Sequence, residues 1–366
     1  MARRQLPRAC SAIPLSRITT SLLLAATVLG ADIVSGGTFD GRSIVHGQSQ
    51  KVTVPTQSAG RNPEVLWQAP DDTRRDLFYG PGGPGHQPDT HGTFTFVDED
   101  LQGSHPKFEV VDGHGVHWKV KLGAEARPET VATRLVWAAG YAADEDYFAD
   151  EIHVDNMPAR LHRGQHLIES NGLVRYVRLK RSSNERRNVG IWAWRQNPFT
   201  GTRELNGLRV LMALINNWDL KDINNAIYET SLDGDGRRER VFEVKDLGLS
   251  FGSTGLERTT HSNGDLEAYR KTSFITHLTP DTVTFATPRR PDWIVLANAP
   301  EFFKRLKLLW IGANIPRADA RWIGSVLSEI PADSIRDAFR AAGYGPDDVE
   351  GFTTVIESRI HQLNNL

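Results

Sequence analysis

Three polar residues whose side chains suit phosphoryl transfer stand together in the stretch NNWDLKDINN, residues 216–225. Asp219 is followed by Lys221 and Asn224, and Asp246 comes later in the chain. Phosphoryl transfer needs carboxylate and amide oxygens that hold divalent metals, a carboxylate near the attacking hydroxyl and a cation on the phosphates. Asp and Asn are also common in ordinary turns and helix caps. The stretch therefore indicates phosphoryl transfer only if the other residues that this chemistry requires occur in the right order on suitable strands, helices and loops.

A candidate for the phosphate-binding cation lies upstream, in the segment KFEVVDGHGVHWKVKLG, residues 107–123. Its apolar and polar residues alternate, which predicts two strands, and Asp112-Gly113 is typical of a hairpin turn between them. Lys121 lies on the second of these strands. Lys121 is the candidate for the cation that phosphoryl transfer requires.

An acidic partner for this lysine follows in the predicted helix over residues 126–141, where Glu129 stands in the first turn. The Glu129 carboxylate could hold the Lys121 ammonium in place. Lys119 shares a strand face with Lys121, however, and Glu125 is a rival to Glu129. The sequence leaves both choices open, and an ordinary surface ion pair would have the same pattern.

The remaining elements place the polar residues at the ends of regular structure. An apolar helix is predicted over residues 202–219 and leads directly into the loop of Asp219. Two short strands are predicted within residues 226–248, with the turn DGDG between them and Asp246-Leu247-Gly248 after them. Three amphipathic helices, beginning near Pro316, Asp333 or Ser334, and Pro346, are predicted to close the chain. Strands first and helices later indicate an α+β protein.

This order resembles the protein-kinase-like superfamily, including its atypical HipA-like and secretory-pathway members. Protein kinases carry a strand lysine, a helix glutamate, the loop His-Arg-Asp-Leu-Lys-x-x-Asn and then Asp-Phe-Gly. Here Asp219, Leu220, Lys221 and Asn224 keep the spacing of that loop, and Asp246-Leu247-Gly248 stands in the place of Asp-Phe-Gly.

The resemblance implies a two-lobed fold with a strand-rich N-terminal lobe over residues 91–180 and a mostly helical C-terminal lobe over residues 181–366. It also implies ATP and Mg²⁺ or Mn²⁺ between the lobes. By this resemblance Asp219 is the catalytic carboxylate, and Lys221 neutralises charge on the transferred group. Lys121 binds the phosphates, with Glu129 as its supporting carboxylate. Asn224 and Asp246 bind the metals.

Three departures from the family pattern keep other functions open. No G-x-G-x-x-G precedes Lys121, Asn217-Trp218 replace His-Arg, and no Ala-Pro-Glu follows Asp246-Leu247-Gly248. The chain could transfer a phosphoryl group to a protein or glycan hydroxyl. It could instead transfer AMP from the same scaffold, or it could be an inactive pseudokinase that serves as a binding or scaffold module.

The N-terminus predicts export. Arginines precede the short apolar run SLLLAATVLGADIV, residues 21–34, as in a secretory signal peptide. We expect a signal peptide over residues 1–31, a linker and Gly/Pro-rich arm over residues 32–90, and a secreted or periplasmic protein without a membrane segment beyond the signal. The single cysteine, Cys10, lies within the signal. The formal net charge of -2 implies no basic surface, so nucleic acid is not an expected partner.

Overall fold

The computed structural model describes residues 64–70, 75–103, 105–183, 186–217, 219–231, 238–253, 263–287 and 306–366, with residues 299 and 303. All of them belong to the compact unit Ala59–Leu366. The predicted signal peptide, the turn DGDG and Trp218 lie outside the described residues. Among the helices described, none combines the length and apolar character that crossing a bilayer requires.

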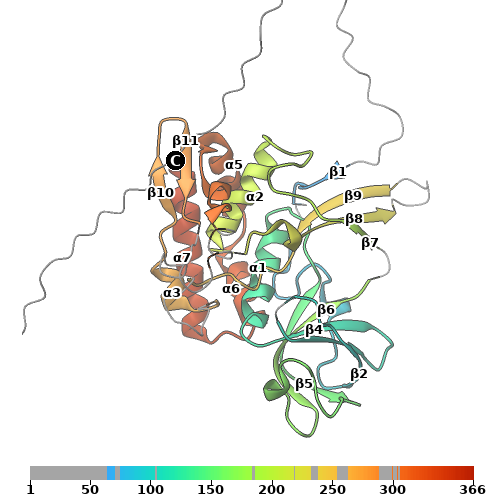
Figure 1. Ribbon diagram of the computed structural model, residues 1–366. Coiled ribbons are helices and arrows are strands. Elements are labelled where there is room, and N and C mark those ends of the chain that lie inside the picture. Colours follow the sequence, from blue (N-terminus) through green and yellow to red (C-terminus); the bar gives the residue numbers. More distant parts are fainter. Residues whose placement is uncertain are drawn as a thin grey trace, which may run out of the picture. The chain divides into compact units, whose positions relative to one another are not determined.

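Five strands close into a small barrel in the order β2-β3-β4-β6-β5 (Figure 1). Neighbouring strands are antiparallel, except that β2 and β5 pair in parallel and close the barrel. The predicted hairpin is confirmed, because Val111 and His117 face each other on either side of the turn. The strands are β2 Thr93–Glu99, β3 Lys107–Val111, β4 His117–Leu122, β5 Asp146–Asp155 and β6 Leu173–Arg181.

Alternation along these strands separates a barrel interior from an outer face. Trp118 and Val120 of β4 point inward and join a buried apolar cluster with Phe108 and Val110 of β3. Side chains of successive strand residues point to opposite faces. His117, Lys119 and Lys121 therefore lie on the outer face of the barrel.

Helix α1, Ala126–Ala138, connects β4 to β5 and is buried along nearly its whole length. It packs against β5 and β6 and also against α6, Ala332–Ala341 (Figure 1). The helix ends before Gly140, whose φ of 93° and close approach to the carbonyl of Gln68 exclude a larger residue there. Helix α1 is thus fixed from several sides, and so are the side chains on its first turn.

A second sheet carries the loop of Asp219. The strand order of this sheet is β1-β9-β8-β7. The apolar helix α2, Arg203–Leu214, precedes the loop and is capped by Thr202, whose hydroxyl accepts from the backbone N–H of Leu205. The loop after α2 continues through the short 3-10 helix η3, Asp222–Asn224. The strands are β1 Glu64–Val65, β7 Arg186–Gly190, β8 Asn225–Ser231 and β9 Arg238–Val244.

The C-terminal part contains the three predicted closing helices. They pack with α1 and α2 into one large apolar cluster. The elements of this part are α3 Leu266–Arg270, β10 Ile275–Leu278, β11 Thr282–Phe285, η5 Leu309–Gly312, β12 Ile315–Pro316, α5 Arg317–Ser328, α6 and α7 Pro346–Asn364. The mixed α and β content agrees with the predicted class.

Part of the segment predicted as a linker is packed against the core. Strand β1 pairs with β9, and Leu66 and Leu77 are buried in the large apolar cluster. The Arg134 guanidinium of α1 donates to the carbonyl of Phe78. Phe78 and Tyr79 are the residues expected to hold this segment to a surface, but isolated apolar residues such as Leu66 and Leu77 show no periodicity, so their burial could not be predicted. The short 3-10 helix η1, Pro84–His86, lies in the same segment.

Candidate functional site

Lys121 lies at the centre of a buried group of carboxylates. Its Nζ is 2.7 Å from Glu129 Oε2, 2.9 Å from Glu125 Oε2 and 2.6 Å from Asp246 Oδ1. The Lys121 side chain is only 6% exposed. The ammonium donates hydrogen bonds to Glu125 and Asp246, and Glu129 contacts it as an ion pair. Three elements meet here: strand β4, the start of α1 and the segment after β9.

The structure distinguishes the two candidate lysines. Lys119 lies on the same face of β4, but its Nζ pairs with Glu109 of β3 at 3.1 Å and its side chain is 48% exposed. Lys121 differs because α1 and Asp246 cover it. Only the second lysine therefore belongs to the carboxylate group.

Both candidate glutamates contact Lys121, and each has a second partner. Glu129 Oε1 accepts from Arg178 of β6 at 3.1 Å. Glu125 Oε1 lies 2.7 Å from Nε2 of His105, in the loop between β2 and β3. Glu125 is the N-cap residue of α1, yet its side chain makes no capping bond. Its carboxylate is directed to Lys121 and His105 instead.

The charges in the group stabilise one another. Burial by itself lowers the pKa of Lys121, but the three carboxylates, Glu129 first, outweigh burial and raise it. Burial by itself raises the pKa of Glu125, but the hydrogen bond with His105 and the charge of Lys121 lower it overall. The lysine is thus held as an ammonium and Glu125 as a carboxylate.

Asp246 occupies an unusual backbone position at the open side of the group. Its φ is 56°, in the left-handed region that non-glycine residues rarely adopt, and its side chain is 43% exposed. Burial by itself raises the pKa of Asp246, but the charge and hydrogen bond of Lys121 outweigh burial and lower the pKa to about 2. Strained residues of this kind are concentrated at functional sites.

The remaining three predicted residues lie together in the loop after α2. Lys221 Nζ is 2.9 Å from Asp219 Oδ1, and Asn224 Nδ2 donates to the backbone carbonyl of Asp219 at 2.8 Å. The Asp219 backbone N–H donates to the side chain of Asn217 at 2.9 Å. These contacts give the loop a defined course around the Asp219 carboxylate.

A backbone hydrogen bond ties this loop to the Asp246 segment. The N–H of Lys245 donates to the carbonyl of Asn224 at 2.8 Å, directly beyond the paired ends of β8 and β9. Asn224 therefore stands across the ladder from Lys245, the residue before Asp246. The structure thus brings Lys121, Glu129 and Asp246 into direct contact, and it brings Asp219, Lys221 and Asn224 into a second group joined to the first through this bond.

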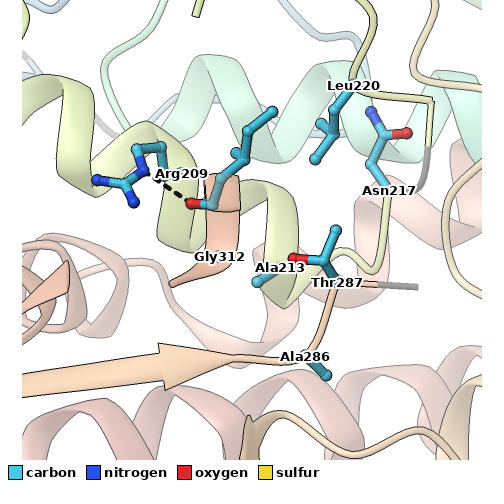
Figure 2. A pocket seen from close by; sticks show the side chains of 8 residues that line it. Arg209, Ala213, Asn217, Leu220, Ala286, Thr287 and Gly312 are labelled. Carbon is cyan, nitrogen blue, oxygen red and sulfur yellow. Dashed lines mark hydrogen bonds between the residues drawn. The ribbon is translucent and has the colours of Figure 1, made fainter. Parts of the chain in front are cut away.

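A packed region behind α2 supports the loop. Figure 2 shows the hydrogen bond of Arg209 of α2, whose Nε donates to the carbonyl of Ile311 at 2.7 Å. Asn217 and Leu220, from the loop of Asp219, line the same hollow. We interpret this region as structural, because the Arg209 guanidinium is already hydrogen-bonded to the surrounding backbone carbonyls.

A larger cavity of about 590 Å³ lies at the barrel. Glu109 and His117, which line it, are on the outer face of the barrel that also carries Lys121. Lys121 is not among the lining residues: the β4 residue that lines the cavity is His117, four residues before Lys121, which corresponds to roughly 13 Å along a strand. The volume is typical of small-molecule sites. Its other lining residues are Gly115, Val116, Arg181, Ser182 and Ser183.

Two residues of the site were not assigned from the sequence. His105 stands in an irregular loop without a motif, and only its proximity to Lys121 across the β3–β4 hairpin could have suggested it. Glu125 was named as a rival to Glu129. The structure shows instead that both carboxylates hold the lysine.

Comparison with known proteins gives solved structures alone. No protein family and no curated protein matches the sequence. A Helicobacter pylori proinflammatory kinase, CtkA, is 11% identical with a TM-score of 0.41, covering 75% of this chain and 96% of that chain. A Golgi casein kinase is 12% identical with a TM-score of 0.28, covering 73% of this chain and 74% of that chain. The same enzyme with Mn/ADP bound also matches, at 12% identity and a TM-score of 0.28, covering 75% of this chain and 72% of that chain. We therefore infer the function from the site itself.

Proposed function

We propose that this protein is a kinase-like phosphotransferase that uses ATP and Mg²⁺ or Mn²⁺ to modify a hydroxyl group on a protein or glycan. The observation that carries the proposal is the position of Lys121. It lies on the third strand of the barrel and is bound both to Glu129 of the following helix and to Asp246, which precedes Leu247 and Gly248. Protein kinases place their phosphate-binding lysine on the third strand and pair it with a helix glutamate.

The residues of the site fit a divalent metal. Carboxylate oxygens of Glu125, Glu129 and Asp246 lie within 4.8 Å of one another, but Lys121 Nζ lies between them, so the partly exposed Asp246 is the carboxylate left to take a metal. In the proposal Asp246, which is partly exposed, holds the metal together with Asn224 across the β8–β9 ladder. When bound, the metal would neutralise charge on the phosphates of the nucleotide.

The loop of Asp219 would supply the acceptor side of the reaction. In the proposed step the acceptor oxygen forms a bond to the γ-phosphorus of ATP while the bond to the β–γ bridging oxygen breaks. The acceptor proton passes to the Asp219 carboxylate, and ADP leaves with the electrons of the broken bond. Lys221, 2.9 Å from Asp219, would offset negative charge on the transferred group.

The cavity at the β3–β4 turn and the end of β6 supports nucleotide binding in this proposal. Its volume of about 590 Å³ can hold a nucleoside, and it lies on the same barrel face as the lysine. A base in this cavity would leave its phosphates directed along β4 toward Lys121. Charged and hydroxyl side chains in the lining offer both donors and acceptors for a base and a ribose.

The export predicted from the N-terminus forms part of the proposal. Residues 1–31 have the arginine-then-apolar pattern of a signal peptide, so we propose that the protein acts in a secreted or periplasmic location. Mass spectrometry of the protein recovered from its native host should show a mature N-terminus near residue 32. A chain that retains Met1 inside the cell would contradict the export proposal.

Transfer of label from ATP tests the proposed chemistry. Incubation with ATP labelled at the γ-phosphate should label an acceptor or the protein itself, and Asp219→Asn should abolish the labelling while retaining the fold. Label transferred from the α-phosphate instead would mean AMP transfer on the same scaffold, which requires the same cation and metals. The absent glycine-rich motif favours a third outcome, a pseudokinase that binds partners and transfers neither label.

A further inference from the structure

The loop between β2 and β3 stands where a kinase-like site needs a cover for the phosphates, yet it lacks the glycine-rich motif. Its sequence from residue 100 is DLQGSHP. A glycine-rich loop approaches phosphates closely because glycine removes the side chain from the backbone. This loop must therefore be placed over the site by other contacts.

The outer side of the loop is anchored to the segment after β5. Arg163 donates to the carbonyl of Asp100 at 2.6 Å and to that of Gly103 at 2.5 Å. The ends of the loop are also joined, because Lys107 pairs with Asp100 at 3.2 Å. These bonds hold the two ends of the loop together and fix the backbone at Asp100 and Gly103.

The inner side of the loop makes its contact with the site through His105. The His105 Nε2 lies 2.7 Å from Glu125 Oε1, while Glu125 Oε2 lies 2.9 Å from Lys121 Nζ. Glu125 also packs directly against Gly248, where an added Cβ would lie 2.6 Å from the Glu125 Cβ. A single carboxylate thus joins the loop, the strand lysine and the segment of Asp246.

We propose that His105 is a positioning residue that latches the β2–β3 loop to Glu125 and so closes the site over the phosphates of a bound nucleotide. The inference deepens the proposed function and rests on it. Closure by a side-chain hydrogen bond would replace closure by a glycine-rich backbone. A closed loop excludes water, and this strengthens the interaction of Lys121 and the metal with the phosphates.

The consequence is a loss of nucleotide affinity. In His105→Ala the loop loses its contact with Glu125, although the Pro106 carbonyl still accepts from the Leu122 N–H, and we expect the dissociation constant for ATP with Mg²⁺ to rise about tenfold, the size typical of one hydrogen bond to a charged group. His105→Gln retains an N–H donor on a side chain of similar reach and should recover most of the affinity. The midpoint of thermal unfolding without nucleotide should also fall in His105→Ala, because buried Glu125 loses a partner, and His105→Gln should restore it together with the affinity.

His162→Ala provides the matched control. The His162 ring also pairs with a glutamate, Glu99, at 3.0 Å, but it is 75% exposed and does not contact the carboxylate group around Lys121. Its removal should leave ATP affinity unchanged. Calorimetric titration of the full chain with ATP and Mg²⁺ would compare wild type, His105→Ala, His105→Gln and His162→Ala.

Hydrogen exchange separates the latch from the function on which it rests. Amides of residues 101–103 should exchange faster in His105→Ala than in wild type, with no change in α7. If wild type binds no nucleotide, the proposed function fails and the latch fails with it. If wild type binds ATP but His105→Ala binds equally well and exchanges equally slowly, only the latch is overturned.

Discussion

Replacing Lys121 by Met should destabilise the fold strongly although it removes a single charged group. The three carboxylates around Lys121 Nζ would lose their shared partner, while Arg178 would remain bound to Glu129 and His105 to Glu125. Removing one partner of a buried ion pair costs about 3–5 kcal/mol. Asp246 is 43% exposed and can regain water, so we expect the lower end, about 3 kcal/mol at pH 7.

The matched variant is Lys119→Met on the same strand. Lys119 is 48% exposed and pairs only with Glu109, and exposed pairs contribute less than about 1 kcal/mol. Urea denaturation of both variants at pH 7 would give the two free energies of unfolding. Equal losses would refute the conclusion that Lys121, and not its neighbour, holds the carboxylate group together.

The pH dependence of the same measurement gives a further check. In Lys121→Met the unpaired carboxylates become easier to protonate, and protonation removes their repulsion. The difference in stability between Lys121→Met and wild type should therefore shrink as the pH falls from about 5 to 3, around the ordinary pKa range of Asp and Glu. A difference independent of pH would indicate lost packing rather than lost charge pairing.

Two further predictions concern the Asp246 segment. Gly248→Ala should cost about 1–3 kcal/mol, because its Cβ would lie 2.6 Å from the Cβ of buried Glu125, and thermal unfolding would measure this; an unchanged midpoint would contradict the close contact. The folded-state pKa of Asp246, about 2, is below its unfolded value, so its ion pair stabilises the protein above about pH 4 and loses that effect as the pH falls toward 2. Asp246→Asn should remove this acid-dependent contribution, about 1 kcal/mol after screening by water, and an acid unfolding curve identical to wild type would contradict it.

The sequence could predict the elements and the candidate residues but not which lysine is buried. Alternation in β4 predicted that Lys119 and Lys121 share one face, and in the structure both lie on the outer face of the barrel. Lys121 is buried and Lys119 is exposed because α1 and Asp246 cover only Lys121. Asp246 is far away in the sequence, and long-range packing leaves no local sequence pattern. The rivalry between Glu125 and Glu129 has the same origin, since both lie within reach of the lysine at the start of α1.

The packed segment before β2 and the role of His105 were beyond the sequence for related reasons. Leu66 and Leu77 are single apolar residues in a polar, Gly- and Pro-containing stretch, so no periodicity marks their burial. His105 is a lone histidine in a loop, which usually indicates nothing. Its importance comes from the close approach of two strands and one helix, a property of the fold and not of the nearby residues.

Thermal unfolding of the full chain with and without ATP and Mg²⁺ or Mn²⁺ tests the central claim most directly, with Asp246→Ala beside wild type. A ligand that binds only the folded state at about 100 times its dissociation constant stabilises by about 2.7 kcal/mol. We predict a metal-dependent rise in the wild-type midpoint that is absent in Asp246→Ala. An unchanged wild-type midpoint with every nucleotide and metal would contradict a nucleotide site at Lys121 and Asp246.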